Sequence, residues 1–289
     1  MALANRREAY YRDYRGQPQE FLSAIKRGFL YQGQWYQWQR KPRGSPVTSQ
    51  PAATFVIYTQ NHDQVANSLQ GQRLTALTDP AHYRALTTLM LLAPETPMLF
   101  MGQEFGASSP FLYFADHHEE VLARSVIKGR KQFLAQFPSH GSIEAQEVIP
   151  NPCSPETFER SKLDFSERTT HASLYLFHQD LLHLRREDPL IARQDRQRLD
   201  GAVLGPEAFV LRFFSEAGDD RLLVVNLGTD LEYVPAPEPL LAPVGGGGWR
   251  VVWSSDDPGY GGPGIINPCG AEGWRLPGAS AVLLVAEKP

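Results

Sequence analysis

The sequence contains little cysteine and no uninterrupted apolar run long enough to cross a membrane. Its 289 residues include two cysteines, Cys153 and Cys269. Because they lie far apart and beside Pro or Gly, we expect free thiols in a reducing compartment and not a disulfide framework. The most apolar stretch, residues 86–101, is interrupted by Pro94 and Pro97. This pattern indicates a helix, a turn and a strand, and it argues against a membrane span there.

The sequence also lacks a strong excess of charge of either sign. Its formal net charge is −4, so a nucleic-acid partner is not indicated. Residues 1–10 lack the apolar segment of a secretory signal, which predicts a cytoplasmic protein with no membrane partner. Hydrophobic residues make up 42% of the chain, as in ordinary globular domains, so a sizeable core is expected.

A short apolar run at residues 55–58 ends in a cluster of polar side chains. The cluster consists of Asn61, His62, Asp63 and Gln64. This order is typical of a buried parallel strand whose C-terminal end supplies an active site. An ordinary strand followed by a polar turn is the alternative, because Asn and Asp favour turns.

A second apolar run with a polar end lies at residues 96–106, where Gln103 and Glu104 follow the apolar positions. Between the two runs, residues 79–93 have apolar side chains at helical spacing: Leu86, Leu89, Met90 and Ala93. Strand, helix and strand in this order predict one step of a parallel α/β sheet. Glu104 could bind substrate or form an ion pair with an arginine, either Arg73 or Arg84.

Three further helices are predicted at residues 2–14, 117–136 and 171–187. Candidate buried positions in the second are Val121, Leu122, Val126 and Phe133. Those in the third are Leu174, Phe177, Leu181 and Leu184. Residues 138–165 are rich in Pro and Ser and are expected to be irregular. The aromatic side chains of residues 29–38 could stack on a sugar or pack against the fold.

From about residue 197 onward, short β-type runs replace the helical pattern. The clearest runs span residues 209–214, 221–227, 249–253 and 281–286. Turn-forming residues separate them, which predicts an antiparallel β-sandwich. The predicted fold class is therefore α/β plus all-β, with one domain at residues 1–194 and a second at residues 195–289.

The order of these motifs resembles that of a known family. Residues 55–56 leading into Asn61, His62 and Asp63 resemble strand seven of the α-amylase-type glycoside hydrolases, and residues 98–105 resemble strand eight. Other segments resemble the maltooligosyltrehalose trehalohydrolases within that family: residues 28–33, 60–65, 71–74, 110–117 and 157–165. The resemblance implies the C-terminal part of a (β/α)8 TIM barrel followed by a β-sandwich domain.

The resemblance also implies roles for individual residues. Asp63 would be the catalytic transition-state stabiliser, and His62 would donate a hydrogen bond to the same sugar. Further substrate-binding candidates are Asn61, Gln64, Gln103, Glu104, Phe111, Tyr113, Asp116 and His117. The implied reaction releases trehalose from a maltooligosaccharide-type substrate by a retaining mechanism and needs no cofactor. No metal is expected, because Asp116 and His117 lack a distant ligand at suitable spacing.

A complete barrel needs about 250 residues, whereas strand seven would begin here near residue 54. The resemblance places the nucleophilic Asp and the acidic Glu of a retaining glycosidase on the earlier strands. We therefore expect this chain alone to be inactive and a separate N-terminal barrel half to be a candidate partner. A glucan branching enzyme and a non-catalytic carbohydrate-binding remnant are the alternatives.

Overall fold

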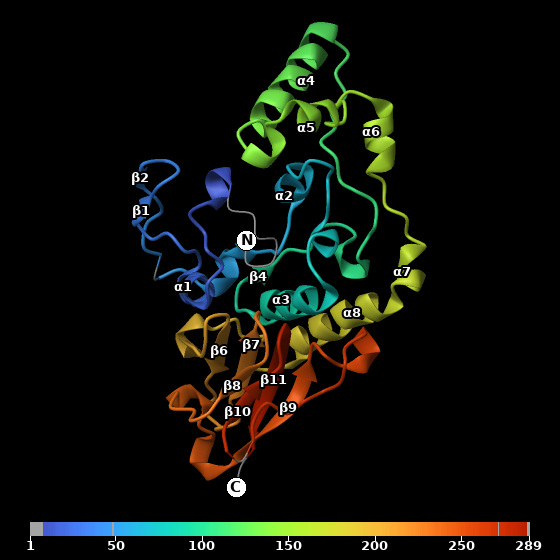
Figure 1. Cartoon of the computed structure of the whole chain (residues 1–289). Coiled ribbons are helices and arrows are strands. Elements are labelled where there is room, and N and C mark those ends of the chain that lie inside the picture. Colours follow the sequence, from blue (N-terminus) through green and yellow to red (C-terminus); the bar gives the residue numbers. More distant parts are fainter. Residues whose placement is uncertain (1–7, 48, 271, 288–289) are drawn as a thin grey trace.

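The computed structural model describes residues 8–47, 49–270 and 272–287. Figure 1 shows an antiparallel sheet at one end, helices α3 and α8 above it, and a peripheral group of helices at the far end. Within the described residues, no helix is both long and apolar enough to cross a membrane. Both cysteines are free, as the sequence predicts.

The predicted strand–helix–strand unit is present. Strands β3 (Val56–Ile57) and β4 (Thr96–Pro97) pair in parallel, and helix α3 (Pro80–Leu92) connects them. Asp79 starts this helix, because its carboxylate accepts hydrogen bonds from the first free backbone N–H groups. The strands are shorter than predicted, and the polar residues that follow each of them belong to helical turns.

The remaining helices vary widely in length. They are α1 (Pro18–Arg27), α2 (His62–Ala66), α4 (Glu120–Leu134), α5 (Ile143–Glu147), α6 (Pro155–Arg160), α7 (Glu167–Thr170) and α8 (Ala172–Glu187). The prediction of an irregular segment at residues 138–165 was wrong, since α5 and α6 lie within it. Of the helix predicted at residues 2–14, the described part forms only a 3₁₀ turn, Ala9–Tyr11, and residues 2–7 lie outside the described residues.

Helix α4 exposes three of the four side chains that were predicted to be buried, and the fourth, Val126, is half-buried. Val121 is 77% exposed, Leu122 is 44% exposed and Phe133 is 42% exposed, whereas Leu134 is buried. The prediction failed because apolar spacing identifies a helix but not its neighbours. This helix lies at the periphery, where few other elements cover it (Figure 1).

The aromatic side chains at residues 29–38 differ in burial. A short hairpin forms from β1 (Trp35–Tyr36) and β2 (Lys41–Pro42). Tyr36 is fully buried and its hydroxyl donates to the Tyr10 carbonyl, so it packs inside the fold. Trp35 is 54% exposed and Trp38 is 40% exposed.

The C-terminal part forms a five-stranded antiparallel sheet with a smaller sheet against it. In order of pairing, its strands are β5 (Leu199–Val203), β6 (Ala208–Phe213), β7 (Arg221–Asn226), β11 (Ser280–Glu287) and β9 (Gly248–Ser254). The small sheet pairs β8 (Leu231–Tyr233) with β10 (Trp274–Leu276). The four predicted strands are confirmed. Strands β5, β8 and β10 were missed because none contains a long apolar run.

One face of the large sheet packs directly on the helices. Leu22 and Ile25 of α1, Leu89 of α3, and Phe177 and Leu181 of α8 share one apolar core with inward residues of β6, β7 and β11. The opposite face packs on the small sheet. Because both faces are covered, every residue of β6 and β7 is buried. The two predicted domains therefore share a core.

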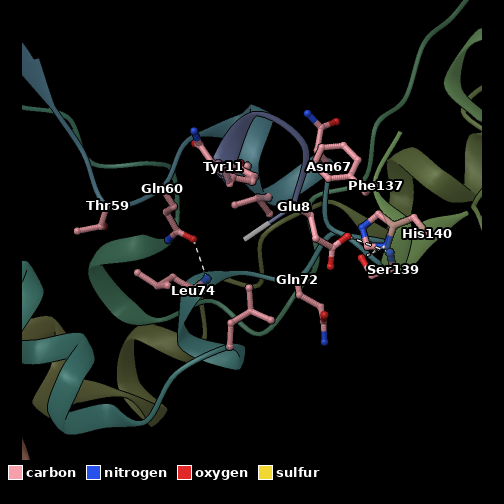
Figure 2. A pocket seen from close by; sticks show the side chains of 13 residues that line it. Glu8, Tyr11, Thr59, Gln60, Asn67, Gln72, Leu74, Phe137, Ser139 and His140 are labelled. Atoms are coloured by element: carbon pink, nitrogen blue, oxygen red, sulfur yellow. Dashed lines mark hydrogen bonds between the residues drawn. The ribbon is translucent and has the colours of Figure 1, made fainter. Parts of the chain in front are cut away.

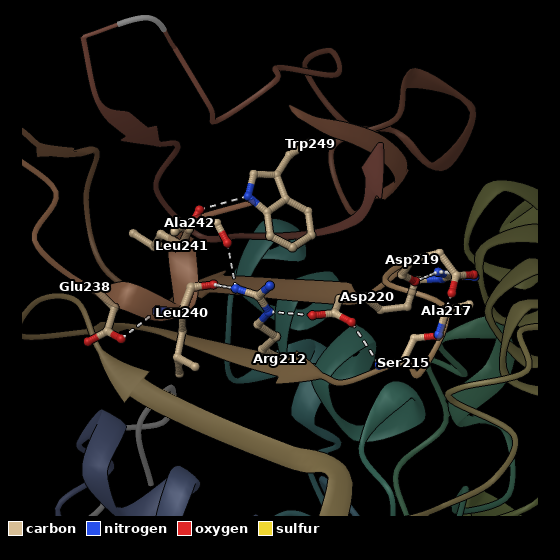
Figure 3. Close-up of polar contacts among 11 residues, drawn as sticks. Arg212, Ser215, Ala217, Asp219, Asp220, Glu238, Leu240, Leu241, Ala242 and Trp249 are labelled. Carbon is tan, nitrogen blue, oxygen red and sulfur yellow. Dashed lines mark hydrogen bonds and ion pairs between the residues drawn. The ribbon is translucent and has the colours of Figure 1, made fainter. Parts of the chain in front are cut away.

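A buried ion pair lies on the face of the sheet away from the helices. The Arg212 guanidinium donates to the Asp220 carboxylate over 2.8 Å and to the Leu240 and Ala242 carbonyls (Figure 3). Asp220 also accepts from the Ser215 backbone N–H. Neither Arg212 nor Asp220 has a buried polar atom without a hydrogen-bond partner. A buried charge is stable in a protein only when its polar atoms are paired in this way.

Candidate functional site

The predicted polar cluster forms the first turn of helix α2, immediately after β3. The Asn61 side-chain oxygen accepts from the backbone N–H groups of Asp63 and Gln64, and the Gln64 side-chain oxygen accepts from the Asn61 N–H. This is a capping box, which closes the N-terminal end of a helix. Asn61 and Gln64 therefore orient the helix, and their predicted contact with substrate stays a prediction.

His62 and Asp63 project from the same turn into solvent. Their side chains are 67% and 66% exposed, and His62 Nε2 lies 3.5 Å from an Asp63 carboxylate oxygen. A carboxylate in the first turn of a helix is favoured by the partial positive charge there. The two side chains are thus exposed, and their predicted contact with substrate stays a prediction.

An open hollow of about 640 Å³ brings predicted residues together. His62 and Asp63 of α2 line it, with Phe111 and Tyr113 from the segment after β4. Helix α4 closes it, and Arg130 lies in that wall. Tyr113 is 44% exposed, so an aromatic surface and a carboxylate face the same space.

Arg130 was not identified from the sequence. Its Nη1 donates to the Asn67 side-chain oxygen over 2.6 Å, and its Nη2 donates to the Ala66 carbonyl. The guanidinium carbon lies 4.9 Å from the centre of the Tyr113 ring. Burial lowers the pKa of Arg130 from its ordinary value. The available signal was its position four residues before the buried Leu134, on the same helix face.

Gln103 has a structural position between the two parallel strands. It is 1% exposed, its Nε2 donates to the Thr59 hydroxyl over 3.0 Å, and its Oε1 accepts from the Phe100 N–H over 3.2 Å. The side chain therefore joins the ends of β3 and β4. Neither Gln103 nor Glu104 lines the hollow beside Asp63.

Glu104 interacts electrostatically with Arg73, one of the two arginines predicted for it, because its negative charge opposes the lowering of the Arg73 pKa by burial. Its carboxylate lies 3.9 Å from the guanidinium of Arg168, which belongs to α7. Arg73 donates to the carbonyls of Ser109 and Met101. Arg84 donates to the Ser255 carbonyl and lies 4.0 Å from the Asp256 carboxylate. The tertiary fold thus also places α7 beside Glu104, a contact that the sequence did not predict.

Asp116 and His117 lie in the exposed segment before α4 and do not line the hollow. Within residues 8–47, 49–270 and 272–287, no group of three or more His, Cys, Asp or Glu side chains is arranged to hold a metal ion. The structure thus brings His62, Asp63, Phe111 and Tyr113 together and leaves Asp116 and His117 apart from them.

A second, smaller cavity uses other residues of the same region (Figure 2). Gln60 and Gln64 line it together with Glu8 and Ser139. The Gln60 side-chain oxygen accepts from the Leu74 N–H over 2.9 Å, and the Glu8 carboxylate accepts from the Ser139 N–H over 2.9 Å. Residues of α2 therefore contribute to two hollows, of which the one with Asp63 is the larger.

Comparison with known proteins shows similarity to one group of enzymes. A family profile described as a domain of unknown function, DUF3459, matches residues 196–284. The malto-oligosyltrehalose trehalohydrolase of Deinococcus radiodurans is 37% identical over 242 residues, which is 81% of this chain and 38% of that protein. The one from Arthrobacter ramosus is 39% identical over 63% of this chain and 31% of that protein.

Two solved structures are also similar to this chain. A putative alpha amylase from Salmonella typhimurium has a TM-score of 0.78 and 29% identity, covering 99% of this chain and 44% of that one. The catalytic module of the glycogen-degrading virulence factor SpuA has a TM-score of 0.53 and 14% identity, covering 94% of this chain and 39% of that one, and shows the fold alone. The chain spans less than two-fifths of the length of the two curated relatives.

Proposed function

We propose, from the confirmed resemblance to the malto-oligosyltrehalose trehalohydrolases, that this chain contributes the strand-seven and strand-eight edge of such a hydrolase. The reaction would cleave the α-1,4 bond next to a terminal trehalose unit. One observation carries the proposal: Asp63, His62 and two aromatic side chains share one open hollow at the end of β3. A carboxylate beside aromatic surface suits a sugar, which presents both hydroxyl groups and an apolar ring face.

Within this site, Asp63 would stabilise the transition state. An ionised carboxylate accepts hydrogen bonds from sugar hydroxyls and attracts the positive charge that develops on an oxocarbenium-like ring. His62 would donate a hydrogen bond to the same sugar. Tyr113 and Phe111 would pack against its apolar face and exclude water from that side.

The site needs two more carboxyl groups for retaining hydrolysis. A nucleophile and an acid must lie about 5 Å apart across the scissile bond. Among the described residues that line the hollow, Asp63 is the one carboxylate. The nucleophile and the acid would therefore come from a further part of the barrel, in the same polypeptide or in a separate one.

The free side of β3 offers a place for that part. Val56 is 58% exposed and Tyr58 is 40% exposed, and both border an apolar hollow formed with α1 and α3. Among the described strands, β3 pairs with β4 alone. A further parallel strand at this edge would cover the apolar side chains and satisfy the exposed backbone groups.

The test is an assay of trehalose release from maltooligosyltrehalose by the natural polypeptide that contains these residues. We expect release, and we expect Asp63→Asn to lower kcat by about 10³-fold, because the ionised carboxylate acts mainly in the transition state. Glu156→Gln, a change at an exposed carboxylate on α6, is the control and should leave kcat unchanged. New branch points without trehalose would favour the transferase, and binding without turnover would favour a carbohydrate-binding role. Either result would reject the proposed hydrolase.

A further inference from the structure

Helix α2 is too short to be stable without contacts to other parts of the chain. It has five residues, and helices shorter than about 12 residues are marginal in water on their own. The capping box closes its N-terminal end. At its C-terminal end, the Val65 carbonyl accepts from the hydroxyl and the backbone N–H of Ser68, and the next carbonyl, that of Ala66, needs a partner from outside the helix. Because α2 has only five residues, contacts that fix its C-terminal end also fix the direction of His62 and Asp63 in its first turn.

Arg130 holds that end from a distant element. Its Nη1 donates to the side chain of Asn67, the C-cap residue, and its Nη2 donates to the carbonyl of Ala66, the last residue of α2. A guanidinium can engage two such oxygens at once because its donors lie in a rigid planar fork, and a lysine cannot reproduce this geometry. A positive charge is also favoured at the C-terminal end of a helix.

The charge of Arg130 has no acidic partner among the described residues. None of the ion pairs of these residues involves it. Its guanidinium also lies over the Tyr113 ring, at 4.9 Å from the ring centre. Its contacts connect three segments that border the same hollow.

Helix α4, which carries Arg130, has few other attachments. Leu134, one turn later on the same face, packs with Phe137 and Ile149, whereas Val121 and Leu122 at the start of the helix are exposed. Arg130 is therefore the polar connection from this helix to α2. Removing it should free both the end of α2 and the ring of Tyr113 while leaving the apolar contacts of Leu134 in place.

We propose that Arg130 is a positioning residue for the site that contains Asp63 and His62. It fixes the C-terminal end of α2, and through the helix it fixes the direction of both side chains. It also holds Tyr113 in the wall of the same hollow. The effect on catalysis rests on the proposed hydrolase function, whereas the effect on α2 does not.

The first experiment measures hydrogen exchange in the natural polypeptide and needs no substrate. The backbone N–H groups of Val65, Asn67 and Ser68 donate within α2 and report its opening. We expect Arg130→Gln to accelerate their exchange by about tenfold or more, because one end of the helix loses two hydrogen bonds. Arg124→Gln is the matched control, since Arg124 lies on the same helix and contacts only Glu120. Unchanged exchange in Arg130→Gln would overturn the proposal.

The second experiment separates positioning from general stability. If the natural polypeptide releases trehalose, we expect Arg130→Gln to lower kcat by about tenfold with a smaller change in KM, because misdirected groups lose contacts made in the transition state. Arg130→Lys should restore α2 exchange and kcat only in part. Equal activity of Arg130→Gln and the parent would overturn the catalytic consequence.

A third variant keeps the proposal testable if Arg130→Gln does not fold. Asn67→Ala removes one acceptor and leaves the Ala66 carbonyl to Arg130. It should give a smaller acceleration of exchange in α2 than Arg130→Gln, and no acceleration would count against the proposal. A parent polypeptide that shows no turnover would refute the hydrolase function, while the exchange measurements would still decide the role of Arg130.

Discussion

The Gln103 side chain donates to the Thr59 hydroxyl over 3.0 Å and thereby joins the ends of the two parallel strands β3 and β4. Thr59 follows β3 and Gln103 follows β4, so two segments 44 positions apart meet below the candidate site. The same side chain accepts from the Phe100 N–H. Gln103 is predicted from the sequence to contact substrate, but both polar atoms of its side chain form hydrogen bonds within the fold.

Gln103→Ala should therefore destabilise the protein. The change leaves the Phe100 N–H and the Thr59 hydroxyl without their partner, and a buried polar group without a partner costs about 1–3 kcal/mol. Urea unfolding of the parent and the variant measures the difference in free energy of unfolding. Gln19→Ala, an exposed position on α1, is the control and should change the free energy little. A stable Gln103→Ala variant with weakened substrate binding would restore the role predicted from sequence.

Glu95 should make stability fall as pH rises toward neutrality. The residue is 2% exposed, its carboxylate has no hydrogen-bond partner in another residue, and burial raises its pKa from 4.5 to about 7, in spite of its own backbone N–H and of Arg196 and Arg185 nearby. The folded state therefore binds the proton more tightly than the unfolded state. The stabilisation that the protonated Glu95 contributes is fully present below pH 4.5 and is lost as pH rises through about 7. The free energy of unfolding should fall by on the order of 3 kcal/mol across this range.

Glu95→Gln tests this dependence, because glutamine stays neutral at every pH. We expect the variant to be more stable than the parent at pH 8 and its stability to vary less between pH 4.5 and 8. Thermal unfolding across this pH range measures both effects. Glu156→Gln, at an exposed carboxylate, should leave the pH dependence of the parent unchanged. An equally pH-dependent Glu95→Gln variant would show that other groups cause the dependence.

His178 should produce the opposite dependence at lower pH. Burial lowers its pKa from 6.5 to about 4, and its Nε2 has no hydrogen-bond partner. The folded state favours the neutral ring, so the stabilisation is present above pH 6.5 and is lost as pH falls through about 4. His178→Phe should reduce the loss of stability between pH 6.5 and 4, measured by urea unfolding. His183→Phe on the same helix is the control, and equal effects of both changes would argue against His178.

The sequence predicted the long elements well and the site only in part. Leu174 to Leu184 repeat at helical spacing and form the inward face of α8, and the apolar runs of β6, β7, β9 and β11 are as expected. Local patterns of this kind report burial directly. They do not report which distant segment meets a residue, which is why Arg130 was missed and the contact of Glu104 with Arg168 was not predicted.

The polar cluster shows a second limit of the sequence. Asn61 and Gln64 appear in the sequence as groups for binding a ligand, yet their side chains close the first turn of α2. The same residue types serve both purposes, because a capping residue and a sugar ligand both need short polar side chains. The sequence pattern predicts that all four residues of the cluster are exposed to a ligand. In the structure, His62 and Asp63 have highly exposed side chains, which distinguishes them from Asn61 and Gln64.

Asp220→Ala should destabilise the protein strongly, because it leaves the Arg212 guanidinium buried without its carboxylate partner. Removing one member of a buried pair costs about 3–5 kcal/mol, whereas Asp219→Ala, in the same turn and 42% exposed at its side chain, should cost much less. The double variant with Arg212→Met should recover part of the loss, since no unpaired charge remains. Urea unfolding of the parent, Asp220→Ala, Arg212→Met and the double variant measures the coupling, with Asp219→Ala as the control. Independent, additive losses would mean that the pair contributes little.

The shared core predicts that the β-type part does not fold stably alone. Phe209, Leu211, Leu223 and Leu283 are fully buried in the parent, and they lie in the core that α1, α3 and α8 complete. A polypeptide of residues 195–289 would expose this sheet face to water, at about 25 cal/mol for each Å² of apolar surface left uncovered. We expect it to bind a hydrophobic dye and to unfold without a sharp transition, whereas residues 8–289 should unfold cooperatively. A cooperative transition without dye binding in the shorter polypeptide would show that residues 195–289 form an independent domain, and that helix packing is not needed for the sheet to form.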